Sequence, residues 1–512
     1  MSVAAYWRLM RAGFVLAREG ALAVTEGQPL PPGVKRLVAV GRTIERRSVR
    51  ATQRVEKLAR ALERLGPTYV KLGQLLATRP DIVGAGIADD LSALHDRMPA
   101  FDERLVPGLL RQALGERRAA QLTEISESVA AASIAQVHRA TLDDGAGPPR
   151  VVAIKMLRPG IEARFQRDLD AVMTYAKLAE RFSPPSRRLR PVAVAQTLER
   201  SALIEMDLRL EAAAMSEMAD NIAGARGFEV PKIEWAHTAR NVLTTNWIEA
   251  ITIRDHGALD AAGLNRKTIA RELMQHFLRH AIQHGFFHAD MHPGNLFVDP
   301  ATGAIKAVDF GIMGRIGKPE RRFLAEILHG FIVRDYRRMA VLHIEIGYVP
   351  STHSVDDFAQ ALRSIGEPMH GRPVSEISMA NMLAQLMAVT ELFDMRTRPE
   401  LVLLQKTMVV VEGVARSLDP SLDLWATAEP VVGDWVRRQA GPLGQAEKLL
   451  EIGTEFAGAA RRVPGLIARY EALLDRAEET EKQRHRHFGP MLAVAAWIAL
   501  VLVGIAAIAT IF

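Results

Sequence analysis

The chain contains no cysteine among its 512 residues, which excludes disulfides, cysteine-ligated zinc and thiol catalysis. It also lacks a strong excess of charge, because 65 basic residues are nearly balanced by 59 acidic ones. A net charge of +6 is too small to indicate a nucleic-acid partner, although it is compatible with an anionic membrane surface. With 48% hydrophobic and 24% charged residues, the composition excludes wholesale disorder.

One long stretch without any charge lies at the C-terminus. Met491–Phe512 is 22 residues long, enough to span about 30 Å of hydrocarbon as a helix. The preceding segment, residues 482–487, is a basic flank that should stay on the cytoplasmic side. The pattern predicts a transmembrane tail anchor, and the alternative is a buried core helix.

The N-terminal segment has the pattern of an amphipathic helix. Trp7, Met10 and Phe14 recur at helical spacing, and arginines line a neighbouring face. These arginines interrupt any apolar run, which excludes a cleavable signal peptide. A helix of this composition either lies on the membrane surface or packs against its own protein.

Hydrophobic spacing divides the region after this helix into a helical part and a β-rich part. An apolar stripe from Val55 to Leu65 predicts a helix that ends at Gly66-Pro67, where another begins. Residues 129–154 are typical of strand, turn and strand, and helices are expected at about 160–180 and 192–222. Phe228–Val230 and Val242–Ile248 predict a further strand pair.

From about residue 267 the pattern is mainly helical. One stripe runs from Ile269 to Ala281 and ends at Gly285, a residue that commonly terminates helices. A small β-rich lobe followed by a larger helical lobe is the arrangement of protein kinases. The predicted fold class is therefore α+β, a bilobal kinase-like fold with a helical N-terminal extension and a C-terminal transmembrane helix.

The most informative motif is His288-Ala289-Asp290-Met291-His292-Pro293-Gly294-Asn295, followed by Asp309-Phe310-Gly311. Kinase-type sites need a carboxylate at the acceptor hydroxyl and two oxygen ligands for Mg²⁺, and Asp290, Asn295 and Asp309 supply that set. Residues 296–298 and 304–308 predict a hairpin that would bring Asn295 and Asp309 to adjacent strand ends. The sequence therefore predicts a site of phosphoryl transfer, whereas a lone Asp-Phe-Gly would more often be a turn.

Three further sets of residues surround this motif. Lys155 ends a predicted strand, as a phosphate-contacting lysine does, and a loop of Ala130, Ala131, Ala132 and Ser133 precedes it where kinases carry glycines. Lys71 and Gln74 share a helix face with Thr78, and Gly73 lets that helix pack closely. Glu205 and Asp207 precede Glu211, with Arg209 expected on another face. Alone, each set is more typical of a solvated surface than of a site.

Together these motifs resemble the UbiB family of atypical kinase-like proteins, also called the ADCK or AarF-related family. The resemblance covers about residues 60–320 and the helical lobe that follows. Its marks are Lys71-Leu72-Gly73-Gln74, the alanine loop, Glu205-Met206-Asp207, and the catalytic motif with Asp309. Met291, Ala214 and Asn246 depart from residues usual in the family, but none of them is a reacting group.

The resemblance implies a role for each part. Lys155 would pair with Glu211 and orient the phosphates of ATP or ADP, Asn295 and Asp309 would bind Mg²⁺, and Asp290 would be the catalytic-loop aspartate. The alanine loop, Asn246 and Ile248 would contact the nucleotide. The helix with Lys71 and Gln74 would lie across the peptide-binding region, facing Glu205 and Asp207. Such a cover would disfavour a peptide acceptor and exclude water.

The implied function is a membrane-anchored, Mg-ATP-dependent atypical kinase or ATPase that supports ubiquinone biosynthesis in the inner membrane of a bacterium. Its expected partners are isoprenoid quinone precursors or other membrane lipids and enzymes that act on them. Two alternatives stay open: a small-molecule phosphotransferase of the aminoglycoside or choline kinase type, and a nucleotide-binding pseudokinase scaffold. The expected domains are 1–34 (amphipathic helix), 35–125 (helical extension), 126–250 (N-lobe), 251–460 (C-lobe), 461–490 (basic segment) and 491–512 (transmembrane helix).

Overall fold

The computed structural model describes residues 3–22, 54–77, 99–182, 190–370 and 399–440, with short pieces between these ranges. The chain divides into two units, residues 1–435 and 436–512, and nearly all of the described residues belong to the first. The predicted anchor at 491–512 lies outside the described residues. Within them, no helix combines the length and apolarity needed to cross a bilayer.

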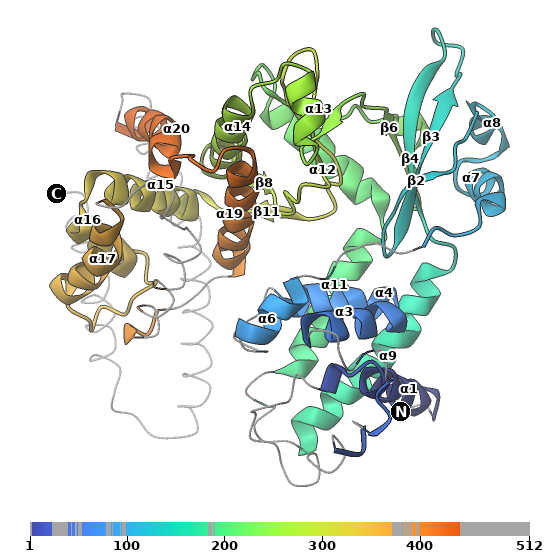
Figure 1. Cartoon of the computed structure of the whole chain (residues 1–512), viewed down its shortest axis with the longest axis horizontal. Coiled ribbons are helices and arrows are strands. Elements are labelled where there is room, and N and C mark those ends of the chain that lie inside the picture. Colours follow the sequence, from blue (N-terminus) through green and yellow to red (C-terminus); the bar gives the residue numbers. More distant parts are fainter. Residues whose placement is uncertain are drawn as a thin grey trace, which may run out of the picture. The chain divides into compact units, whose positions relative to one another are not determined.

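Helices at the N-terminus pack on one another around a shared apolar core (Figure 1). They are α1 (Val3–Arg18), α3 (Arg54–Leu65), α4 (Pro67–Ala77) and α6 (Ala85–Ser92). The predicted boundary between α3 and α4 is confirmed, and Gly66 makes the turn with a φ of +110°. Gly73 is needed for close packing, because a Cβ at this position would overlap the side chains of Leu62 and Leu94.

A five-stranded sheet forms the β-rich lobe, as residues 129–154 predicted. Its strands are β1 (Leu122–Thr123), β2 (Ser128–Ala131), β3 (Ala135–Leu142), β4 (Arg150–Leu157) and β6 (Val242–Asn246). Their order is β1-β3-β4-β6, with β2 paired to β3, and every pairing is antiparallel.

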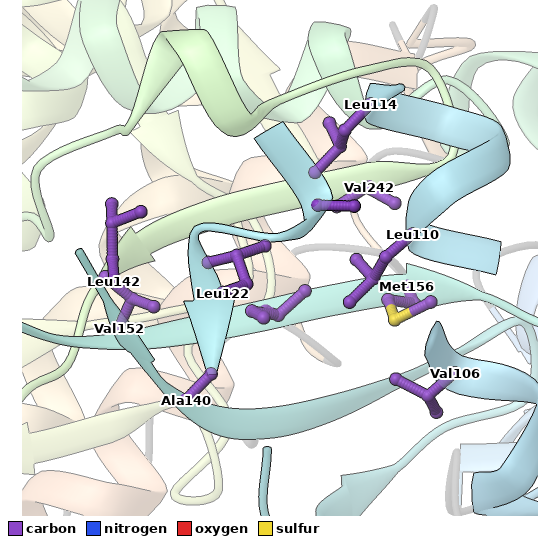
Figure 2. Close-up of a cluster of buried hydrophobic side chains, with 11 residues drawn as sticks. Val106, Leu110, Leu114, Leu122, Ala140, Leu142, Val152, Met156 and Val242 are labelled. Atoms are coloured by element: carbon purple, nitrogen blue, oxygen red, sulfur yellow. The ribbon is translucent and has the colours of Figure 1, made fainter. Parts of the chain in front are cut away.

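Two short helices, α7 (Val106–Leu114) and α8 (Glu116–Ala119), pack against this sheet, and the 3-10 turn η3 (Glu103–Leu105) precedes them. Figure 2 shows the cluster that joins them, in which Leu110 and Leu114 of α7 meet Met156 and Val242 of the sheet. Because Met156 adjoins Lys155, the same core that fixes the sheet also fixes the strand that carries this lysine.

The helical region between β4 and β6 differs from the prediction in one respect. It contains α9 (Ile161–Phe182), α11 (Pro191–Glu205) and α12 (Leu208–Asn221), so the helix expected at 192–222 is in fact two helices. The break lies at Met206-Asp207, where Asp207 has an extended φ of −120° and its side chain accepts a hydrogen bond from the Arg209 N–H. Asp207 is therefore the N-cap of a new helix, a role for which aspartate is well suited.

The expected pairing of Phe228–Val230 with Val242–Ile248 was wrong in its partner. Strand β5 (Phe228–Glu229) runs parallel to β10 (Ile305–Ala307) instead. The residues that hydrogen-bond to β6 follow β5 in the sequence. Asn246 N donates to Lys232 O and Glu234 N donates to Thr244 O, each at 2.9 Å. The 3-10 turn η4 (Trp235–His237) follows them.

The second lobe is mainly helical, as predicted. Its helices are α13 (His256–Ala261), α14 (Arg266–Arg279), α15 (Lys318–Val333), α16 (Tyr336–Glu345), α17 (Val355–His370), α19 (Pro399–Leu418) and α20 (Leu424–Ala440). Its short strands are β7 (Ile251–Thr252), β8 (Phe286–His288), β9 (Leu296–Val298), β10 and β11 (Met313–Arg315). The apolar stripe of α14 is buried, and after one π-helical turn, η5 (His280–His284), the chain turns at Gly285 with a φ of +67°.

Candidate active site

The predicted hairpin brings the parts of the catalytic motif together. Strands β9 and β10 pair antiparallel, with Leu296 opposite Ala307. Val308 N donates to Asn295 O at 2.9 Å, so the residue before Asp309 is joined directly to Asn295. The Asn295 amide donates to the Asp290 carboxylate at 3.1 Å and to its carbonyl at 3.0 Å. Asp290, Asn295 and Asp309 therefore belong to one hydrogen-bonded frame.

His288, which begins the motif, has a structural role. Its side chain is fully buried, Nδ1 accepts from Asp290 N at 3.1 Å and Nε2 donates to Val308 O at 3.1 Å. One neutral tautomer satisfies both bonds, and burial lowers the pKa of His288 in keeping with that state. His288 therefore joins the catalytic loop to the strand that leads to Asp309.

Lys155 lies between two carboxylates. Its Nζ is 2.8 Å from Glu211 of α12 and 2.7 Å from Asp309. The Glu211 side chain is 7% exposed and that of Lys155 18%, whereas the Asp309 side chain is 44% exposed and opens toward solvent. The pairing of Lys155 with Glu211 that the resemblance implied is present.

Burial and charge act in opposite directions in this cluster. Burial opposes the ammonium of Lys155, but Asp309 and Glu211 together raise its pKa well above the ordinary value. Although the Asp309 side chain is partly exposed, the protein packed around it disfavours its carboxylate, yet Lys155 lowers its pKa to about 2. Burial raises the pKa of Glu211. Asp309 is thus ionised at neutral pH, and its φ of +62° places it in the left-handed region, where a non-glycine residue needs support from its surroundings.

The donor set fits a Mg²⁺ ion. Magnesium takes oxygen ligands and is commonly held by one or two protein groups together with phosphates. In the described part of the chain, the Asn295 side-chain oxygen accepts no hydrogen bond, and Asp309 uses only Oδ1 toward Lys155. No group of three or more His, Asp or Glu side chains among those residues could hold a metal by itself. Water and phosphate oxygens would therefore complete the ligands of the ion.

The alanine loop lies at the end of β2 and turns back into β3. Ala132 N donates to Ala135 O at 2.8 Å, and Ser133 is fully buried. Arg158, which directly follows β4, donates from Nε and Nη2 to the Ala132 carbonyl at 3.0 and 2.8 Å. This arginine, which the sequence did not single out, holds the loop in place.

One of the contacts expected of the predicted cover is present. Lys71 of α4 forms an ion pair with Glu205 at the end of α11, and each side chain is 10% exposed. Asp207 does not take part, because Arg209 turns back and binds its carboxylate at 2.9 and 2.6 Å, contrary to the expectation that Arg209 lies on another face. The expected position of Thr78 lies outside the described residues.

The segment after β6 has the features of an adenine-binding hinge. The Asn246 side chain is occupied locally, since it accepts from Lys232 N and donates to Trp247 O at 3.2 Å. Trp247 N donates to Val151 O at 3.0 Å. Among the described residues, the backbone of Ile248 makes no hydrogen bond, so its N–H and C=O remain open to a ligand.

A second residue that the sequence did not indicate supports the catalytic loop from α19. Thr407, which is 1% exposed, has its hydroxyl 2.8 Å from the Leu403 carbonyl of its own helix and 3.2 Å from the Ala289 carbonyl, so the two carbonyls share its single proton. Thr407 and Ala289 are 118 positions apart, so no local pattern could have joined them.

Comparison with known proteins decides the family. The chain matches the ABC1 atypical kinase-like domain over residues 93–343 and the UbiB helical domain over residues 362–423. The chain belongs to the UbiB family. It is 39% identical to the "Probable protein kinase UbiB" of Marinobacter nauticus, over 82% of this chain and 77% of that protein. The UbiB of Aeromonas hydrophila is 38% identical over 85% of this chain and 78% of that protein.

A solved structure supports the kinase-like fold of this member of the UbiB family. The complex of Rv3197 with erythromycin from Mycobacterium tuberculosis is 23% identical, with a TM-score of 0.51 over 73% of this chain and 95% of that chain. At this identity the likeness concerns the fold alone. The family match beyond residue 343 is informative for the site, because the UbiB helical domain includes α19 and thus Thr407.

Proposed function

We propose that this chain is an atypical kinase or ATPase that binds Mg-ATP at the bilayer surface and supports ubiquinone biosynthesis by acting on isoprenoid lipid intermediates or on the enzymes that handle them. The observation that carries the proposal is the position of Lys155 between Glu211 and Asp309, beside the hydrogen-bonded pair of Asp290 and Asn295. Family membership and the predicted C-terminal anchor support the cellular role.

In this proposal each residue has a defined task. The ammonium of Lys155 binds nucleotide phosphates, and Glu211 holds that ammonium in place. Asn295 and Asp309 would hold Mg²⁺, which neutralises phosphate charge when bound. Asp290 accepts the proton of the attacking hydroxyl or water. The open backbone of Ile248 receives the adenine.

The ion pair between Lys71 and Glu205 supports a restricted acceptor. Both groups are largely withdrawn from water and join α4 to α11, the helix that leads to the helix of Glu211. A cover closed in this way leaves little room for an extended peptide and limits the access of water. We therefore favour a small or lipid acceptor, or water itself, over a protein substrate.

The experiment is an ATPase assay on the full chain with anionic liposomes and phenolic quinone precursors. The expected result is a basal Mg-dependent rate that rises with these additions and is lost in Asp309→Asn. Absence of any Mg-ATP-dependent shift in thermal unfolding of the wild-type protein would refute the proposal.

The same assay separates the alternatives. Stoichiometric transfer of phosphate to one soluble alcohol or aminoglycoside would identify a small-molecule phosphotransferase. Tight ATP binding together with full rescue of a quinone-deficient strain by Asp290→Asn would identify a scaffold.

A further inference from the structure

A lysine on α19 lies close to the catalytic aspartate without belonging to any recognised motif. Lys406 directly precedes Thr407, whose hydroxyl binds the carbonyl of Ala289, the neighbour of Asp290. Helix α19 also packs on α14 and contacts β11, the strand that pairs with β8 just before the catalytic loop (Figure 1). The position of Lys406 beside the loop is therefore set by the packing of α19 and by the contact of the Thr407 hydroxyl with the Ala289 carbonyl.

No acidic residue that the structure describes lies within ion-pair distance of the Lys406 ammonium. The side chain is only partly exposed, and burial lowers the pKa of its ammonium, while the nearby Asp290 carboxylate favours the charged form. Within the described residues, this ammonium makes no ion pair and no hydrogen bond. A partly buried cation without a partner is unfavourable, and such groups normally have a counter-ion in the functional state.

Asp290 alone does not supply that counter-ion. Its carboxylate accepts the Asn295 amide, and no contact within ion-pair distance joins it to Lys406. An anion placed between Asp290 and Lys406 would have a cation on one side and the proton-accepting carboxylate on the other. In a site of phosphoryl transfer, the group that occupies this place is the terminal phosphoryl of the nucleotide.

We propose that Lys406 is a further phosphate-binding residue, whose ammonium contacts the terminal phosphoryl group of a nucleoside triphosphate on the side of Asp290. The inference rests on the proposed nucleotide-binding function and adds a residue from the UbiB helical domain to it. In the transfer, the bond from the terminal phosphorus to the bridging oxygen breaks and a bond to the acceptor oxygen forms. The proton of the acceptor goes to Asp290, and Lys406 keeps its own.

The two lysines then have separable tasks. Lys155, held by Glu211 and Asp309, serves the part of the nucleotide that ADP and ATP share. Lys406 serves only the phosphoryl group that ATP has and ADP lacks. The preference for triphosphate over diphosphate should therefore depend on Lys406 and not on Lys155.

The test compares binding of Mg-ADP and of a non-hydrolysable Mg-ATP analogue to the full chain by calorimetry. In Lys406→Met the affinity for the analogue should fall about tenfold or more, as expected for a lost charged hydrogen bond, and the affinity for Mg-ADP should stay within about twofold. Lys406→Arg should retain much of the preference. Lys267→Met, at an exposed lysine of α14, is the control and should change neither affinity.

Several outcomes would overturn the inference. Unchanged affinities in Lys406→Met, or equal losses for both nucleotides, would refute a contact with the terminal phosphoryl. If Lys406→Met does not fold, Lys406→Gln takes its place, and its affinities for the analogue and for Mg-ADP are compared in the same way. A wild-type chain that binds neither nucleotide would refute the proposed function itself, which distinguishes the two failures.

A purely positional role through Asp290 is tested in the Asp290→Asn background. If Lys406 only orients Asp290, adding Lys406→Met to Asp290→Asn changes nothing further. If it contacts the phosphoryl group, the loss of analogue affinity persists in the double variant.

Discussion

Acidification should destabilise the folded protein well above the pKa range of its carboxylates, because three of the buried histidines have pKa values far below the ordinary one. His276, His280 and His343 are 5%, 2% and 3% exposed. Burial lowers their pKa values to about 4, 3 and 4, and for His280 the neighbouring His276 lowers it further. His280 packs edge-on against Phe228 with ring centroids 4.8 Å apart, which leaves no place for a hydrated charge.

Linkage between protonation and folding determines the sign of this effect. An unfolded histidine titrates near pH 6.5 and these folded ones far lower, so the unfolded chain binds more protons between those values. The stabilising contribution is complete above pH 6.5 and is lost as the pH falls toward 4. Protonation of each histidine in the unfolded chain lowers the free energy of unfolding by about 1.4 kcal/mol between pH 7.5 and 5.5. The three together should therefore lower it by about 4 kcal/mol.

The assay is urea-induced unfolding at half-unit steps of pH, combined with measurement of proton uptake on unfolding at pH 5.5. His280→Phe removes one titrating group and keeps an aromatic ring at the site, so its proton uptake should be lower by about one. A free energy of unfolding that is flat between pH 7.5 and 5.5 would refute the reasoning. So would equal proton uptake by His280→Phe and the wild type.

Further substitutions test the site and its cover. Lys155→Met should cost about 3 kcal/mol of stability because it leaves Glu211 buried without its cation, and Glu211→Gln in the same chain should restore part of this in urea titrations. Gly73→Val should lower stability by about 1–3 kcal/mol through overlap with neighbouring leucines, visible as a lower urea midpoint with an unchanged slope. Arg158→Gln should free the Ala132 carbonyl and speed amide exchange in the alanine loop. An unchanged exchange rate would show that Arg158 does not hold this loop in place.

Much of the site could be predicted because its signals are local. The hairpin between Asn295 and Asp309 needs only two short apolar runs and a turn, and both strands form where expected. The helix stop at Gly285 and the turn at Gly66 depend on backbone conformations that glycine adopts readily. Lys155 was placed correctly because a strand of alternating burial carries it near its end.

The remaining features depend on contacts between distant residues. The break at Asp207 was missed because Met206 is buried and continues the apolar pattern, so nothing in the hydrophobic spacing marks a stop. The parallel partner of β5 is about 77 positions away, beyond any local rule. Thr407 reaches the catalytic loop from a helix whose own sequence shows only an ordinary apolar stripe.

The pairing of β5 with β10 has a mechanical consequence. β5 follows the helix of Glu211 by a few residues, and β10 ends two residues before Asp309, so one short ladder joins the backbones behind both carboxylates that flank Lys155. The lobes are thus connected twice, through this ladder and through the segment at Trp247. Two connections oppose hinge opening more than they oppose twisting. The distance between the two carboxylates should therefore change little as the lobes move.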